Sequence, residues 1–156
     1  MKVRVFSVGT KMPSWVQEGI VEYQKRMTAD LSFSLHEIPM AKRTKNTNVE
    51  QCIQKESEAL LAAVPANDRL IALDVTGKTF STEALAEKIS AYRQDGVNIS
   101  LLIGGPDGLG RDCLALATER WSLSALTFPH PLVRVLLAEQ FYRAFSIIKG
   151  HPYHRS

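Results

Sequence analysis

The sequence contains few of the features that mark metal-binding, membrane or disulfide-rich proteins. Its 156 residues include only two cysteines and four histidines. Cys52 and Cys113 lie far apart and in no metal-ligand spacing, so two free thiols in a reducing compartment are the simplest interpretation. No apolar run reaches about 18 residues, and the charges of Lys2 and Arg4 interrupt the first strand-like segment, so we expect neither a membrane span nor a signal peptide. We therefore expect a cytoplasmic protein without a bound metal.

Nucleotide-phosphate motifs are also missing, although one stretch comes close to them. A short apolar run at 101–103 leads into segment 104–110, which contains four glycines, one proline and one aspartate. No position in it starts a G-x-G-x-x-G pattern, and Arg111 and Asp112 stand where a P-loop needs lysine and a hydroxyl. A buried strand that runs into a glycine-rich turn still marks the edge at which open α/β sheets bind ligands. The alternative is a tight strand-to-helix turn that binds nothing.

Composition and charge are those of an ordinary globular protein. Hydrophobic residues make up 45% of the chain and charged residues 22%. The length suits one domain over residues 1–156. The formal net charge of +3 is mildly basic, which favours contact with a polyanion but is weak evidence on its own.

Short strand-like runs alternate with segments of helical periodicity. The runs lie at 3–8, 31–38, 70–75, 97–103 and 121–128, the last including an exit loop, and residues 76–78 are interpreted as a turn. The last helix is expected over residues 132–148. This alternation predicts an α/β fold with a mostly parallel sheet flanked by helices.

The last predicted helix is apolar on nearly all sides. Leu137, Ala138, Phe141 and Phe145 share one face, and further apolar residues lie around it. Such a helix is buried in a core or in a subunit interface. Since one small domain offers a limited core, we expect a homodimer through this helix. Arg134 lies on the same apolar face and either extends its charge to solvent or holds an anion.

Basic residues gather near the C-terminus and in one earlier loop. Three of the four histidines lie in the last 27 residues together with Arg134, Arg143, Lys149 and Arg155. This cluster suits phosphate binding, and Tyr153 is able to stack on a base, although a frayed terminus is the alternative. Lys42, Arg43 and Lys45 form a second basic segment, which is either a solvated loop or a nucleic-acid contact.

Several blocks of the sequence resemble the SPOUT-superfamily methyltransferases that act on large-subunit ribosomal RNA. They are VGTKMP at 8–13, LLIGGPDGL at 101–109, SLSALT at 122–127, PHPLVR at 129–134 and the tail HPYHR at 151–155. The resemblance runs the full length of the chain. Any single block would be a weak match, but the C-terminal blocks together are highly specific.

The resemblance implies a fold, a cofactor and a reaction. The fold would carry a deep C-terminal trefoil knot and form a homodimer. S-adenosyl-L-methionine would lie between three loops, which on this chain are those at Leu73, at Gly104 and at Leu123, Ser124, Ala125, Leu126, Thr127 and Phe128. The reaction would be methylation of N3 of a pseudouridine in 23S rRNA of the assembled ribosome.

Methyl transfer to a ring nitrogen requires an in-line approach at near-attack distance and loss of the N3 proton. The candidates for this catalytic role are Arg143, His154 and Arg155, and which of them acts on the proton is left open. The candidates for RNA contacts are Arg134, Tyr153, Lys42 and Arg43. Two other functions are weighed against this one: a ribosome-binding assembly factor, which would bind no cofactor, and a small oxidoreductase, whose glycine fingerprint is missing.

Overall fold

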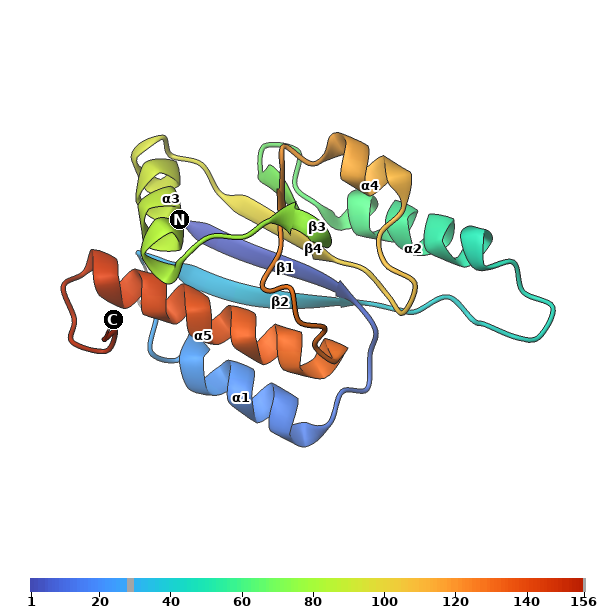
Figure 1. Ribbon diagram of the computed structural model, residues 1–156, viewed down its shortest axis with the longest axis horizontal. Coiled ribbons are helices and arrows are strands. Elements are labelled where there is room, and N and C mark those ends of the chain that lie inside the picture. The colour runs from blue at the N-terminus through green and yellow to red at the C-terminus, as the bar shows by residue number, and fades with distance from the viewer. Residues whose placement is uncertain (28–29, 156) are drawn as a thin grey trace.

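The computed structural model describes residues 1–27 and 30–155 and has alternating strands and helices (Figure 1). In chain order they are β1 (Lys2–Val8), α1 (Ser14–Gln24), β2 (Ser32–Ile38), α2 (Val49–Ala63), β3 (Arg69–Lys78), α3 (Thr82–Gln94), β4 (Ile99–Ile103), α4 (Arg111–Leu116), β5 (Glu119–Trp121) and α5 (His130–Ile148).

The strands form one five-stranded sheet in the order β2-β1-β4-β3-β5, and every neighbouring pair is parallel. This confirms the predicted mostly parallel α/β fold. Because the strands are parallel, the carboxyl ends of β1, β3 and β4 lie at the same edge of the sheet, and β5 ends beside Leu73 of β3. The threading of the C-terminal segment into a knot stays a prediction.

Two predicted boundaries at this edge are wrong. Residues 76–78 do not form a turn, because β3 continues to Lys78 and pairs with Trp121 after an irregularity that follows Leu73. The last strand is Glu119–Trp121, so it ends where the predicted run of 121–128 begins, and residues 122–128 all belong to the exit loop. The loop after β3 therefore begins beyond Lys78, and the loop after β5 begins beyond Trp121.

Helices cover both faces of the sheet, and the side chains of β1 alternate between them. Val3 and Val5 face a core shared with α1, α3 and α5, whereas Phe6 and Val8 face a smaller core shared with α2 and α4. β4 is buried along its whole length, as a central strand with helices on both sides must be. The sheet is thus the middle of three layers, which leaves its edge of strand ends free to form a site.

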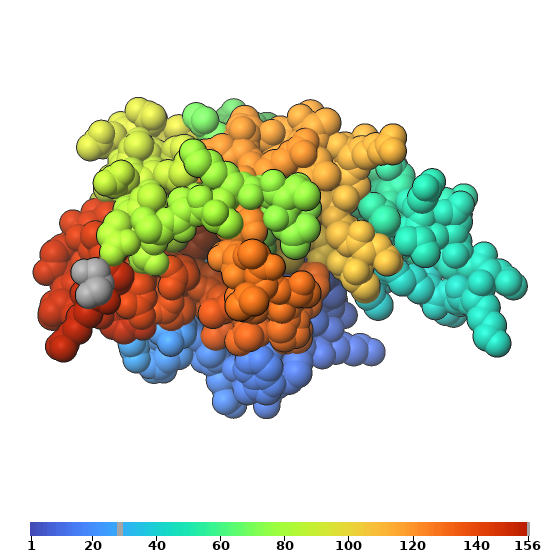
Figure 2. Space-filling model, in the orientation of Figure 1, coloured from blue at the N-terminus to red at the C-terminus, as the bar shows by residue number. Residues whose placement is uncertain are grey.

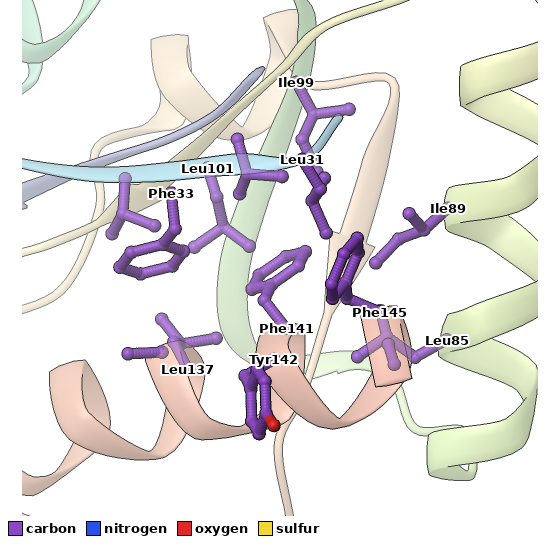
Figure 3. Packing of buried hydrophobic residues seen from close by; sticks show 14 of the residues in the cluster. Leu31, Phe33, Leu85, Ile89, Ile99, Leu101, Leu137, Phe141, Tyr142 and Phe145 are labelled. Atoms are coloured by element: carbon purple, nitrogen blue, oxygen red, sulfur yellow. The ribbon is translucent and has the colours of Figure 1, made fainter. Parts of the chain in front are cut away.

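The apolar side chains of α5 pack mainly into the core of this chain. In Figure 3, Leu137, Phe141 and Phe145 point from α5 toward the core residues of the sheet, and Phe141 lies near Phe33 with ring centroids 5.8 Å apart. Leu137, Phe141 and Phe145 are all buried, and α5 packs against α1 and α3. The apolar face of α5 is therefore buried in the core of this chain, and the homodimer through this helix stays a prediction.

Candidate functional site

A cavity of about 240 Å³ opens at the carboxyl ends of the central strands. Its walls are residues 73–75 of β3, at the irregularity that follows Leu73, the turn after β4, the loop after β5 and the first turn of α5. The lining residues are Leu73, Asp74, Val75, Ile103, Gly104, Gly105, Gly108, Leu109, Ser122, Leu123, Ser124, Leu126, Thr127, Phe128, His130 and Val133. Three segments that the sequence predicted to form a cofactor site therefore meet in one cavity.

Residues 104–110, here called the glycine loop, turn sharply after β4. The Gly108 amide donates to the Gly105 carbonyl at 3.0 Å, and Gly108 has a φ of +85°, which favours glycine. A Cβ on Gly104 would overlap the Gly108 backbone and lie 2.7 Å from the Leu109 nitrogen. The Gly104 hydrogen thus makes room for the loop's own backbone.

The loop after β5 closes the opposite side of the cavity. Its backbone is fixed by two serines, because the Leu126 amide donates to Ser124 Oγ at 3.0 Å and Ser122 Oγ donates to the Ser124 carbonyl at 3.1 Å. Figure 2 shows this loop in orange at the centre of one face, between the green end of β3 and the blue α1. Leu126 is 70% exposed. Ala125 is exposed and does not line the cavity, unlike the other predicted residues of this loop.

Charge around the cavity is sparse. Among the described residues that line it, Asp74 is the only one with a charged side chain, and none is lysine or arginine. His130 lines the cavity from the start of α5, and its pKa is lowered from 6.5 by burial and then by the nearby positive charge of Arg134. The imidazole is thus neutral near pH 7. Sequence reasoning grouped His130 with the basic cluster and missed its place in this site.

Arg134 is fully buried and faces no solvent. It donates from Nη1 to Glu37 Oε2 at 2.7 Å and from Nη2 to the Gly9 carbonyl at 2.8 Å. Its Nε has no partner in the described part of the structure, and neither has the buried Ser7 hydroxyl. The guanidinium neither extends to solvent nor presents itself to an RNA, which corrects the expected RNA contact. It ties α5 to the ends of β1 and β2.

The C-terminal tail folds back along α5 rather than fraying. Tyr153 donates to Glu139 Oε1 at 3.0 Å, and its ring packs against Tyr142 and the Arg143 guanidinium. Burial, followed by the hydrogen bond to Glu139, raises the pKa of Tyr153 to about 12. The stacking surface predicted for a base is therefore partly occupied by this chain's own side chains.

His154 lies between Arg143 and Glu83. Arg143 Nη1 lies 3.3 Å from His154 Nδ1, and His154 Nε2 lies 2.9 Å from Glu83 Oε1. Because a guanidinium only donates hydrogen bonds, Nδ1 accepts one from Arg143, and Nε2 donates one to the Glu83 carboxylate. Arg155 is exposed. The three candidate catalytic residues are thus close together, but in the described structure none of them lines the cavity.

The other two predicted RNA contacts differ from each other. Lys42 is exposed, whereas Arg43 is largely covered and pairs with Glu56 and Asp107.

Within residues 1–27 and 30–155, no group of histidine, cysteine, aspartate or glutamate side chains is arranged to hold a metal ion. No helix in the same residues has the length and apolar character needed to cross a membrane.

The chain matches known proteins over nearly its full length. A family model described as "Predicted SPOUT methyltransferase" matches residues 1–154. Two curated relatives named ribosomal RNA large subunit methyltransferase H match over 155 residues, which are 99% of this chain and 100% of each relative. One, from Saccharophagus degradans, is 54% identical, and the other, from a Marinomonas species, is 53% identical.

A solved structure has the same fold. It is a probable methylase family protein from Haemophilus influenzae Rd KW20, which matches 99% of this chain and 70% of its own with a TM-score of 0.59. At 12% sequence identity, this likeness concerns the fold alone.

Proposed function

Because the chain belongs to the SPOUT methyltransferase family, we propose that it transfers a methyl group from S-adenosyl-L-methionine to N3 of a pseudouridine in 23S rRNA of the assembled ribosome. The observation that carries the proposal is the cavity at the carboxyl ends of the parallel strands, where the three predicted cofactor loops meet. The names of the two curated relatives support large-subunit rRNA as the substrate. Such a protein works in the cytoplasm, where ribosomes are.

The residues around the cavity fit this cofactor. S-adenosylmethionine carries a sulfonium and an ammonium group, and a wall without lysine or arginine does not repel them. Asp74 supplies a carboxylate for a cationic group, and the backbone of the glycine loop and of residues 122–128 offers donors and acceptors to an adenine edge. When bound, the cofactor supplies an electrophilic methyl group. The protein's part is to hold it and to exclude water.

The tail residues serve catalysis in this proposal, but not at the cavity of their own chain. Helix α5 has 19 residues, so its ends lie about 27 Å apart. The cavity is at the His130 end, whereas the tail packs near Arg143, about 20 Å along the axis from His130. We infer that Arg143, His154 and Arg155 act at the cavity of a second subunit in a homodimer.

The homodimer forms through surface that this chain leaves uncovered. Leu136 of α5 is half-buried and lines a second cavity with Phe80 and Phe128, and Leu126, two residues before Phe128 in the chain, is exposed. Apolar side chains of this kind favour contact with a partner. In such a dimer, Lys42 and Tyr153 remain the candidate RNA contacts.

Methylation of purified ribosomes tests the proposed function. Ribosomes from cells that lack the protein would be incubated with it and S-adenosylmethionine, and their 23S rRNA would be analysed by mass spectrometry for 3-methylpseudouridine. The expected result is one added methyl group per assembled ribosome. Ribosome binding without cofactor binding would favour an assembly factor instead. Equal methylation of protein-free 23S rRNA would contradict the assembled ribosome as the substrate.

A further inference from the structure

Helix α2 buries two polar side chains, Glu56 and Ser57, with exposed fractions of 2% and 1%. A polar group at such a position destabilises the fold unless it is hydrogen-bonded, and an unpaired carboxylate does so most. Both side chains are satisfied by contacts to segments outside the helix. Their partners identify what these two residues do.

Glu56 holds the loop that precedes α2. Its Oε2 accepts from Arg43 Nη1 at 2.7 Å and from the Ala41 amide at 3.0 Å, and its Oε1 accepts from Arg43 Nη2 at 3.0 Å. The Arg43 guanidinium therefore grips the carboxylate with two parallel hydrogen bonds, an arrangement that fixes its orientation.

Arg43 continues this contact to the glycine loop, because its Nε donates to Asp107 Oδ2 at 2.9 Å. Its Nη1 also donates to the Ala41 carbonyl at 3.0 Å, so four of the five guanidinium N–H donors have a partner. Few donors are left for an RNA phosphate. This geometry opposes the RNA contact expected for Arg43 and gives it a role within the protein.

Ser57 and Glu56 fix the two ends of the same loop. Ser57 Oγ accepts from the Gly110 amide at 2.9 Å. At the other end, a Cβ on Gly105 would lie 2.9 Å from Glu56 Oε1, so the loop backbone is packed directly onto this carboxylate. With Asp107 held by Arg43, the glycine loop is fixed at its start, its apex and its end.

The held loop is a wall of the cavity, whereas the residues that hold it are not. Gly104, Gly105 and Gly108 line the cavity, and Arg43, Glu56 and Ser57 do not. We propose that Arg43, Glu56 and Ser57 are positioning residues that preset the glycine loop for cofactor binding, with Arg43 as the link between Glu56 and Asp107. The proposal rests on the function proposed above. A preset loop binds more tightly because less conformational entropy is lost on binding.

Cofactor affinity of the full-length protein tests this role. Calorimetry with S-adenosylmethionine would compare the wild type with Arg43→Lys, Asp107→Asn and the double variant. Lysine keeps the charge that an RNA phosphate would attract but cannot bridge both carboxylates. Each single variant is expected to raise the Kd about tenfold. The double variant is expected to have nearly the same Kd as either single variant, because all three variants break the same contact between Arg43 and Asp107.

The matched control is Lys42→Ala, which removes an exposed positive charge from the same loop. It is expected to leave cofactor affinity unchanged and to weaken ribosome binding, whereas Arg43→Lys has the opposite pattern. A merely structural role for Arg43 would lower the unfolding temperature without this separation of the two affinities. If Arg43→Lys and Asp107→Asn both bind the cofactor as the wild type does, the proposal is overturned.

Hydrogen exchange in the free protein separates this proposal from the proposed function. The Gly108 amide, which donates to Gly105 within the loop, is expected to exchange faster in Arg43→Lys and in Asp107→Asn. Unchanged exchange in both variants would refute the positioning role even if the wild type bound no cofactor. Absence of cofactor binding by the wild type would count against the proposed function alone.

Discussion

A mixture of two inactive variants is expected to regain methyltransferase activity. The first variant ends after Gly150 and so lacks the tail with His154 and Arg155. The second carries Gly104→Val, whose side chain cannot be accommodated because a Cβ at this position already overlaps the Gly108 backbone. The glycine loop must shift, and the cavity loses the shape needed to bind the cofactor. The first variant keeps its cavity and the second keeps its tail.

The magnitude follows from the length of α5 and from the statistics of dimer formation. Near-attack geometry requires reacting groups within about 3.5 Å, whereas His154 packs on Arg143, about 20 Å along the helix from the cavity. Each active site therefore needs a cavity from one subunit and a tail from the other. In an equimolar, fully exchanged mixture, half of the dimers are mixed, and each has one complete site, so about one quarter of the wild-type activity is expected.

The assay is single-turnover methylation of ribosomes that lack the modification, with cofactor binding measured on the same samples. Each variant alone is expected to be inactive, and the truncated protein alone is expected to bind cofactor almost as the wild type does. The controls are sedimentation of both variants as dimers and cooperative thermal unfolding. Dimers that exchange freely but give no activity in the mixture would refute the two-subunit site.

Four further results are expected. Gly104→Val alone abolishes S-adenosylmethionine binding in calorimetry through displacement of the glycine loop, and undiminished binding would refute the assigned cavity. Leu136→Glu leaves the fold intact but shifts sedimentation to the monomer, whereas Phe141→Glu costs several kcal/mol of stability because it buries a charge in the core; a dimeric Leu136→Glu variant would exclude this contact. Ribosome binding weakens steeply as salt is raised, since each phosphate contact releases counterions, and a flat response would argue against a basic RNA surface. Because the pKa of His130 is lowered in the folded state, the unfolded chain binds a proton on this imidazole at a higher pH than the folded chain does. The free energy of unfolding therefore falls as the pH drops below 6.5 toward the lower folded-state pKa. Urea unfolding of His130→Gln is expected to show a smaller decline over this pH range, and an identical decline would contradict this assignment.

The strands and the sheet could be predicted from the sequence because apolar runs record burial on both faces of a strand. The runs at 3–8 and 101–103 became adjacent buried strands, and the glycine-rich segment after the second became a sharp turn that lines the cavity. The family was also evident from local blocks of sequence. These features depend on residues that are close together in the chain.

The partners of the charged residues could not be predicted, because they come from segments far apart in the chain. Arg43, Arg134 and His130 all belonged to basic segments of the sequence. The fold buries Arg134 against Glu37, joins Arg43 to Glu56 and Asp107, and places His130 in the cavity. Composition indicates that such side chains are charged or titratable. Only the tertiary structure decides which of them meet opposite charges, lose water and so act within the protein rather than at its surface.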